Sequence, residues 1–205
     1  RAARGAVAAA LSAGAKALGE RAGERAAELK VLTQQRDADG SMLGLYRNTQ
    51  QVRPVNINKI IADTTELFAG PLQQAGIKVR SQMGEVPDTV IAADQIGQVL
   101  SNLILNARDA MPEGGRLWIR SRHIAAQRED HGWVRVLVAD TGTGIPRELI
   151  PSIFDPFITT KGEKGTGLGL WIVKGIMQSH AGKLSVKSKL GRGTVFKVEL
   201  PVGKG

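Results

Sequence analysis

The sequence lacks cysteine and has few aromatic residues, and both absences narrow what the protein can do. No Cys occurs among the 205 residues. This excludes a disulfide framework and thiolate metal sites, and it fits a reducing compartment such as the cytoplasm. The aromatic residues are four Phe, three Trp and one Tyr, and they are scattered rather than grouped among basic residues. Because proteins that stack nucleic-acid bases need such groups, no nucleic-acid partner is expected.

Long apolar runs are missing as well, whereas positive charge is in excess. No apolar stretch reaches the length of a membrane span and no signal peptide is recognisable, so we expect a soluble cytoplasmic fragment, with anchoring of the parent protein left open. The chain begins at Arg1 rather than Met, which indicates part of a longer protein. Its 28 Lys and Arg outnumber 19 Asp and Glu, for a net charge of +9. This charge suits an anionic ligand, an acidic partner or nucleic acid, without choosing among them.

Residues 1–50 contain no Pro and are rich in Ala, Arg and Glu, which predicts a helical arm. Leu11, Leu18 and Leu32 share a seven-residue register, and the glycines around 19–23 predict a break between two helices. Large apolar residues are sparse, so a solvated or partly disordered arm stays open as the alternative. A helical arm would cover its apolar face with a second copy, and we therefore expect a homodimer through this arm.

Residues 51–205 show the pattern of one α+β domain. Asn56 is a candidate cap for a helix that closes near Gly70-Pro71, and the helix over 94–111 has an inward apolar row. Strands and helices of these lengths predict a two-layer α/β sandwich, a mixed sheet with helices on one face. The expected helices span 57–68, 94–111 and 168–179; the expected strands span 77–82, 89–92, 116–124, 133–139, 183–189 and 194–200.

The stretch 140–170 is the most informative part of the chain. One glycine cluster holds Gly142 and Gly144, another holds Gly165, Gly167 and Gly169, and about twenty irregular residues lie between them. So long an irregular connection in a small domain is typical of a lid or a binding loop. Glycine lets backbone N–H groups approach an anion or a flat ring closely. The stretch therefore predicts a nucleotide pocket with a mobile cover.

Spacing excludes two familiar phosphate loops here. A dinucleotide-binding loop needs Gly-x-Gly-x-x-Gly, but Leu170 stands where the third Gly is required. A P-loop counted from Gly162 needs Lys at position 168, which is Leu168. The second cluster still suits phosphates, because it runs into a predicted helix whose free N–H groups attract anions. Lys161 and Lys164 could add charge; a flexible turn with solvated lysines is the alternative.

Two further features indicate a base end and a metal end for such a ligand. Asp140 ends an apolar strand, and a buried carboxylate there needs a donor such as an adenine amine; an Asp satisfied by its own turn is the alternative. Asn102 and Asn106 share one helix face with Asp109 one turn on. Their amides could support a Mg²⁺ that keeps its waters and phosphate ligands, although a polar stripe on an exposed helix would look the same.

The order of these features strongly resembles the catalytic ATP-binding domain of two-component sensor histidine kinases. This domain belongs to the ATPase superfamily shared with type II topoisomerases and heat-shock chaperones, and the resemblance covers about 55–200. It implies the Bergerat-type fold for 51–205, and Gly193-Thr194 fits the small threonine motif near the base. The matching motifs are NLILNARDAM at 102–111 (Asn box), DTGTG at 140–144, FDPF at 154–157 (Phe box) and GTGLGL at 165–170.

The resemblance implies a role for each matching residue. Asn106 would bind Mg²⁺ with support from Asn102, Asp140 would read adenine N6, and Lys161 would touch the γ-phosphate. Asn102, Asn106 and Lys161 are the implied catalytic residues. Phe154 would hinge the lid or pack it against the core together with Phe157. The implied ATP-binding set is Asn102, Asn106, Asp109, Asp140, Gly142, Gly144, Ile145, Phe157, Lys161, Lys164, Gly165, Thr166, Gly167, Leu168, Gly169, Leu170 and Thr194.

Asn102 and the histidines bear on mechanism. Hydrolysing relatives carry a Glu one turn before the metal Asn as general base, whereas Asn102 is a poor base. Phosphoryl transfer to a protein is therefore favoured over fast ATP hydrolysis. His123, His131 and His180 all lie in the ATP domain, outside the context of the family's acceptor histidine. MLGLYR at 42–47 resembles the end of the second dimerisation helix.

Two explanations for the missing acceptor stay open. Either it lies upstream of Arg1 in the parent protein, which we favour, or the parent never had one. The leading hypothesis is thus the kinase core of a histidine kinase, with ATP and Mg²⁺ as cofactors and a response regulator as partner. The alternatives are a non-catalytic ATP-sensing or scaffold module that acts through its arm, and a stand-alone ATPase. DNA binding through the positive charge is a distant fourth.

Overall fold

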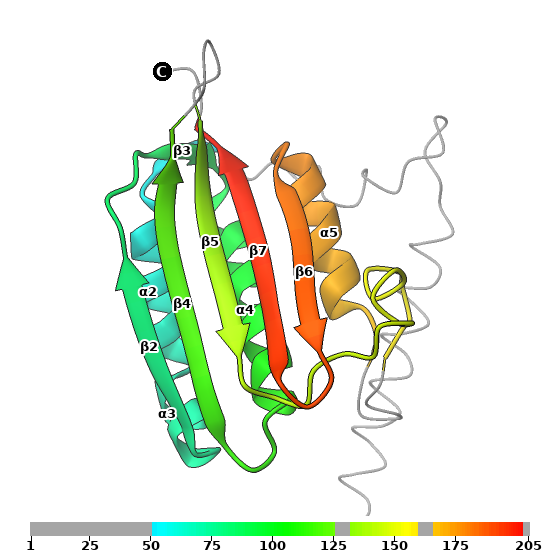
Figure 1. Ribbon diagram of the computed structural model, residues 1–205. Helices are drawn as coiled ribbons and strands as arrows, with labels where there is room; N and C mark the ends of the chain where they lie inside the picture. Colours follow the sequence, from blue (N-terminus) through cyan, green and yellow to red (C-terminus); the bar gives the residue numbers. More distant parts are fainter. Residues whose placement is uncertain (1–50, 126–131, 160–165, 203–205) are drawn as a thin grey trace, which may run out of the picture. The chain divides into compact units, whose positions relative to one another are not determined.

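The described residues, 51–125, 132–159 and 166–202 of a computed structural model, centre on a five-stranded mixed sheet (Figure 1). The helical arm expected for 1–50 lies outside them. Strand β2 pairs in parallel with β4, and all other pairings are antiparallel. In spatial order the strands are β2 (Ile77–Met83), β4 (Gly115–Ile124), β5 (Trp133–Asp140), β7 (Gly193–Pro201) and β6 (Lys183–Lys189).

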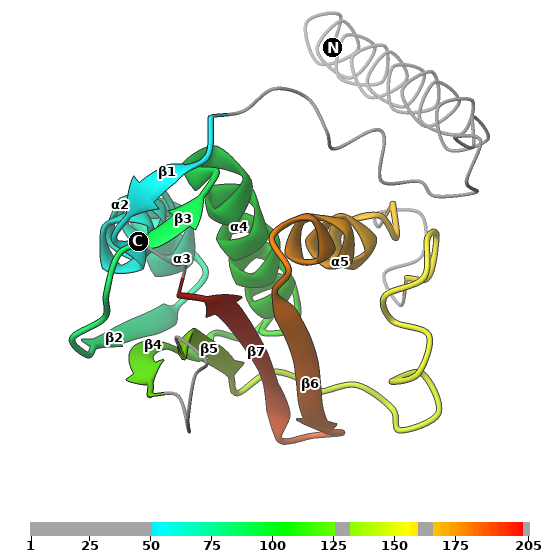
Figure 2. The same cartoon turned by 90° about the horizontal axis from the view of Figure 1, so that it is seen from above.

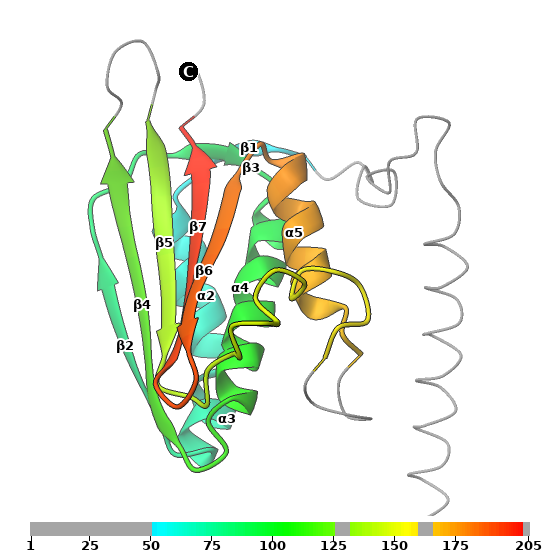
Figure 3. The same ribbon diagram turned by 45° about the vertical axis from the view of Figure 1, so that its right-hand side comes forward.

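Alternation along the strands gives the sheet one buried and one open face. In β5, Val134, Val136 and Val138 are at most 2 % exposed, whereas every residue between them is half-buried. Successive strand residues point to opposite faces, so one row packs into the core and the other faces outward. All helices of the described domain lie on the buried side (Figure 3). The predicted two-layer sandwich is confirmed.

Three helices form most of the second layer: α2 (Ile57–Leu67), α4 (Ala93–Asp109) and α5 (Gly169–Ser179). Asn56 caps α2, because its side-chain oxygen accepts a hydrogen bond from the N–H of Asn58 at 3.1 Å. The central helix α4 buries an apolar row with the 3- and 4-residue spacing that the sequence predicted. Burying each such side chain contributes roughly 1.5–3 kcal/mol; the row is Ile96, Val99, Leu100, Leu103 and Ile104.

Two local features were not predicted. The helix expected to close near Gly70-Pro71 does end close to it, at Leu67, but a further short helix, α3 (Ala69–Gln74), begins two residues later and contains both residues. Pro71 fits the first turn of α3 because N–H groups there have no partner within the helix. Strand β3 (Thr89–Ile91) was expected, but it pairs with β1 (Arg53–Val55) in a separate two-stranded sheet rather than joining the main one.

His180 fixes α5 against the start of α4, the two helices that lie side by side in Figure 2. The N–H of Ala92 donates to Nε2 of His180 at 3.1 Å. Nδ1 lies 2.9 Å from the carbonyl oxygen of Ile176. The ring therefore links the end of α5 to the residue that precedes α4. Within the described ranges, no helix combines the length and apolar character needed to cross a membrane.

Candidate functional site

A cavity of about 950 Å³ opens beside α4, between the loop after β5, the segment 149–159 and the start of α5. It draws residues together from distant parts of the chain. Eleven members of the predicted ATP-binding set line it: Asn102, Asn106, Asp109, Asp140, Gly144, Ile145, Thr166, Gly167, Gly169, Leu170 and Thr194. Gly142, Phe157 and Leu168 are near neighbours in sequence but not part of the lining. Lys161, Lys164 and Gly165 lie outside the described residues.

Asp140 supplies a buried carboxylate to this cavity. It is the last residue of β5, on the inward row, and is 8 % exposed. One oxygen, Oδ1, accepts hydrogen bonds from the N–H of Gly142 at 2.8 Å and from the N–H of Thr194 at 3.2 Å. Burial raises the pKa of Asp140, and the two backbone hydrogen bonds offset this only in part. Since both bonds end on Oδ1, Oδ2 is the oxygen available to a ligand.

Close packing fixes the loop after Asp140. A Cβ on Gly142 would meet the carbonyl oxygen of Ala110 at 2.5 Å. The N–H of Thr143 donates to the same carbonyl at 2.9 Å, which ties the loop to the end of α4. Gly144 has φ +72°, and a Cβ there would collide with the backbone carbonyl of Lys189. Glycine is therefore required at both positions for the loop to lie between α4 and the β6–β7 hairpin.

Ser188 lies behind this end of the cavity and bonds to residues that line it, and the motifs did not point to it. Its Oγ accepts from the N–H of Ile145 at 2.8 Å and lies 2.9 Å from Oγ1 of Thr194. It also donates to the carbonyl of Gly193 at 3.0 Å. A single hydroxyl thus joins β6, β7 and the loop after β5. The one available signal was alternation, which puts Ser188 on the inward row of β6 with Val186.

The Asn stripe of α4 forms the opposite end. Asn102 and Asn106 both line the cavity, and a Cβ on Gly169 would come within 3.2 Å of Oδ1 of Asn102. The start of α5 is therefore close to the Asn stripe. Asp109 pairs with Arg108 at 2.8 Å, with side chains 30 % and 38 % exposed respectively. This arrangement brings neutral amide oxygens next to a helix N-terminus, a combination suited to a phosphate chain and its counterion.

The segment between the two glycine clusters is tied down at its ends. Phe154 packs edge-to-face against the core residue Phe196, with ring centroids 6.5 Å apart, so it has the packing role expected of it. Phe157 instead is 48 % exposed. Its φ of +66° is uncommon for a residue other than glycine. Its N–H donates to the carbonyl of Gly167 at 3.1 Å, joining the two sides of the lid segment.

The described residues contain no group of three or more His, Cys, Asp or Glu side chains that could hold a metal ion. At the Asn end of the cavity the candidate donors are instead two amides and one carboxylate, those of Asn102, Asn106 and Asp109. Mg²⁺ keeps several waters and binds mainly through substrate phosphates. These residues therefore fit a Mg²⁺ that is held largely by a nucleotide rather than by a protein cage.

Comparison with known sequences gives a consistent result. The profile of the family described as "Histidine kinase-, DNA gyrase B-, and HSP90-like ATPase" matches residues 91–204. Sensor kinase CckA of Brucella abortus (strain 2308) is 38% identical and aligns with 76% of this chain but 18% of its own length. The sensory histidine kinase/phosphatase NtrB of Rhodobacter capsulatus is 35% identical, over 74% of this chain and 44% of its own. The chain thus spans less than half of these relatives.

Solved structures agree with the sequence comparison. The catalytic domain of histidine kinase ThkA superposes with a TM-score of 0.65 and 33% identity, covering 74% of this chain and 95% of that domain. Full-length ShkA in complex with AMPPNP superposes with a TM-score of 0.69 and 28% identity, covering 80% of this chain and 34% of ShkA. The chain therefore contains the equivalent of nearly the whole ThkA catalytic domain.

Proposed function

Because the chain belongs to the histidine kinase-, DNA gyrase B- and HSP90-like ATPase family, we propose that it is the ATP-binding kinase core of a sensor histidine kinase. In this role it transfers the γ-phosphate of Mg-ATP to a histidine that this chain does not supply. The observation that carries the proposal is Asp140, a buried carboxylate in a nucleotide-sized cavity with both backbone hydrogen bonds on one oxygen.

The base of ATP lies at the end of the cavity formed by β5 and β7. Oδ2 of Asp140 accepts a hydrogen bond from the exocyclic amine of adenine, because Oδ1 is already occupied. Gly144 and Ile145 offer backbone next to the ring, and Thr194 approaches from β7. A hydrogen bond to a buried charged group contributes roughly 1.5–3 kcal/mol, so Asp140 would provide much of the selectivity for adenine.

The phosphates lie at the other end, between the Asn stripe and the start of α5. Backbone N–H groups in 166–169 and the positive end of the α5 dipole attract the chain of phosphates, and Lys161 and Lys164 add charge from the lid. Asn106, supported by Asn102, holds the Mg²⁺. When bound, this ion neutralises charge that develops on the transferring phosphoryl group. The bound nucleotide in the related ShkA, AMPPNP, is an analogue of ATP and is consistent with this assignment.

Transfer to a histidine is favoured over hydrolysis because Asn102, an amide, stands one turn before the metal-binding Asn106. Asn102 occupies the position from which a carboxylate would activate water in hydrolysing relatives, and an amide cannot do so. The chain's own His180 is a poor acceptor, since Nε2 accepts from Ala92 and Nδ1 bonds within α5. The acceptor is therefore a histidine in a dimerisation helix. The dimer is a homodimer formed through residues 1–50. The partner that then receives the phosphoryl group is a response regulator in the cytoplasm.

One experiment tests this proposal against its alternatives. The chain is incubated with γ-labelled ATP, Mg²⁺ and a separate dimerisation domain that carries an acceptor histidine. We expect label on that domain, none when its histidine is replaced by alanine, and none with Asp140→Asn. ATP binding without label would instead support a scaffold module, and rapid release of free phosphate without the partner domain would support an ATPase.

A further inference from the structure

The open face of the sheet, on the side away from the helices, is strongly basic. Outward positions alternate with core positions along each strand, and Lys or Arg occupies many of them. On β2 and β4 they form one basic margin and on β6 another. The exposed members of this basic face are Lys78, Arg80, Arg116, Arg120, Arg122, Lys183, Lys187 and Lys189.

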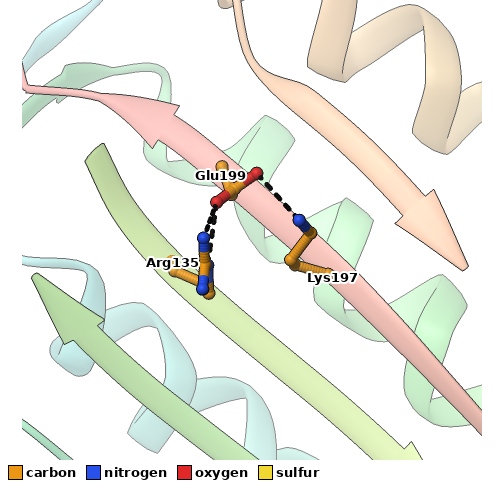
Figure 4. Close-up of polar contacts among 3 residues, drawn as sticks. All are labelled: Arg135, Lys197 and Glu199. Atoms are coloured by element: carbon orange, nitrogen blue, oxygen red, sulfur yellow. Dashed lines mark hydrogen bonds and ion pairs between the residues drawn. The ribbon is translucent and has the colours of Figure 1, made fainter. Parts of the chain in front are cut away.

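The outward positions of these five strands include one acid, Glu199, and it is already paired. Nη2 of Arg135 lies 2.6 Å from Oε1 of Glu199, and Nζ of Lys197 lies 3.4 Å from Oε2 (Figure 4). Burial alone would raise the pKa of Glu199, but the hydrogen bond and charge of Arg135, with those of Lys197, lower it. Glu199 therefore stays ionised and satisfied within the sheet, and the outward positions of the five described strands hold no further acid to pair with the eight exposed cations.

Apolar side chains lie among the cations. Trp118 and Trp133 are half-buried on this face, the first with the guanidinium of Arg116 5.5 Å from its ring centroid. The ammonium of Lys183 lies 3.8 Å from the ring centroid of Trp133. Val195 is 37% exposed on β7. The face thus combines long cationic side chains with Trp and aliphatic groups, the mixture found where proteins meet the polar boundary of a bilayer.

The positive charge of the chain excludes two binding partners for the basic face, the chain's own residues 1–50 and a second copy of the chain. Residues 1–50 contain eight Lys and Arg against five Asp and Glu, a net charge of +3. The whole chain carries +9. Neither the chain's own arm nor a second copy is complementary to this face, since like charges repel. The occupant is therefore anionic, and it is neither residues 1–50 nor a second copy of this chain.

The width of the sheet and the cations over its Trp rings distinguish among the possible anionic partners, which are duplex DNA, single-stranded nucleic acid and a lipid bilayer. Five strands about 4.8 Å apart span about 19 Å, which is too wide to enter a DNA major groove of about 12 Å. Binding of single strands by base stacking needs free aromatic rings, but a cation already lies over Trp118 and another over Trp133. A sheet face does, however, present all its cations to one side, where a planar anionic surface can meet many at once.

We propose that this basic face docks the domain peripherally on an anionic lipid bilayer. Lys78 and Arg80 at one margin and Lys187 at the other contact anionic headgroups, while the Trp side chains lie at headgroup level. Each cation near such a surface strengthens binding by roughly fivefold, so eight of them are ample for stable but salt-dependent attachment. The ATP cavity is on the opposite, helical side of the sheet and stays open.

The test is co-sedimentation of the full chain with vesicles of phosphatidylcholine alone or with one-third phosphatidylserine. We expect binding to the anionic vesicles only, with a large loss at high salt because exposed charges are screened. Lys78→Gln/Arg80→Gln/Lys187→Gln should weaken binding about a hundredfold. The matched control, Arg53→Gln/Lys59→Gln/Lys174→Gln, removes the same charge from β1, α2 and α5 and should bind like the unmodified chain.

Three results would overturn the proposal. Equal losses in the two triple variants would mean that net charge, rather than this face, determines binding. A lack of binding to anionic vesicles at low salt would exclude the bilayer. Tighter binding of a labelled DNA duplex than of vesicles at the same salt, lost in the Lys78/Arg80/Lys187 variant, would assign the face to nucleic acid. Unfolding midpoints of both variants, followed by Trp fluorescence, show that the domain remains folded.

Discussion

Asp140 shows, at the scale of single residues, how one side chain can favour the ligand and oppose folding. Asn in its place can still accept both hydrogen bonds on Oδ1, but it presents an N–H₂ donor where adenine also presents a donor. We therefore expect Asp140→Asn to weaken ATP binding about a hundredfold, measured by titration calorimetry. Asp63→Asn, an exposed change on α2, should leave the affinity unchanged.

Asp140→Asn, which should weaken ATP binding, should not weaken the fold. Burial raises the pKa of Asp140 in the folded state above that in the unfolded chain. Its contribution to stability is thus fully present below the unfolded pKa and is lost as pH rises through the folded pKa. Asn does not ionise, so the free energy of unfolding of Asp140→Asn should equal or exceed that of the unmodified chain at pH 7, with the gap closing toward roughly pH 4. Urea unfolding across this range measures it; a variant less stable at pH 7 would contradict the prediction.

Replacing Gly144 and Gly191 separates two contributions to the loss of stability. One is the clash of an added Cβ with neighbouring backbone, and the other is the strain of a positive φ. Their φ values are +72° and +73°, but a Cβ on Gly191 would meet nothing within 4 Å, whereas one on Gly144 would collide with the Lys189 carbonyl. Gly191→Ala should therefore cost only the left-handed conformation, about 1–2 kcal/mol. Gly144→Ala should cost a further ~1–3 kcal/mol from crowding, together with ATP affinity. Equal losses in urea unfolding would show that the loop relaxes freely.

At the scale of elements, the β6–β7 hairpin contacts the loop after β5 through the Ser188 hydroxyl and through a backbone hydrogen bond from Gly191 to Thr143 at 2.7 Å. Ser188→Ala leaves the N–H of Ile145 without its acceptor, at a cost of about 1–3 kcal/mol. Because that loop also carries Asp140, ATP affinity should fall roughly three- to tenfold. Ser185→Ala, outward on the same strand, should change stability by less than about 0.5 kcal/mol. Lost stability with unchanged ATP affinity would limit Ser188 to a structural role.

Elements with strong periodicity could be predicted from the sequence, and those decided by distant partners could not. The inward row of α4 and the alternation of β5 are local patterns that report burial directly, and both are confirmed. The segment Arg53–Val55 is a three-residue strand with a proline in it, so nothing local marks it. It pairs with β3, so Thr89–Ile91 belongs to a separate sheet. Contacts between segments distant in the sequence determine this pairing. The short helix α3 was not predicted, because Pro71 was interpreted only as the end of a helix, whereas a proline also fits the first turn of one.

At the scale of the whole molecule, the site is built from segments far apart in the sequence. The Asn stripe, the two glycine clusters and Thr194 were predicted to share one ligand because their order resembles a known family, and one cavity does bring eleven of the predicted residues together. Spacing along the chain could not show that Ala110 and Lys189 supply the backbone surfaces against which the glycines lie. Those contacts are made by backbone atoms, which every residue type has, so the identities of the residues do not reveal them.

The assembled site also predicts how ligands stabilise the whole domain. No metal-binding cluster exists among the described residues, so Mg²⁺ should reach the site only with ATP. Mg²⁺ alone should leave the unfolding midpoint unchanged, ATP alone should raise it, and both together should raise it most. At a hundredfold excess over Kd, binding adds about 2.7 kcal/mol, which corresponds to roughly 5–10 °C for a domain of this size.

Tryptophan fluorescence is the suitable signal for this measurement, because all three Trp lie beyond residue 100 and none lies in the first 50 residues. The midpoint therefore reports the ATP domain and not the arm. At the same Mg-ATP concentration, Asp140→Asn with its hundredfold weaker binding should gain only about 0.4 kcal/mol, which ties the stabilisation to the base end of the cavity. A rise in the midpoint with Mg²⁺ alone would mean that the protein itself holds a metal, and the assignment of Asn106 to a nucleotide-borne Mg²⁺ would then be wrong.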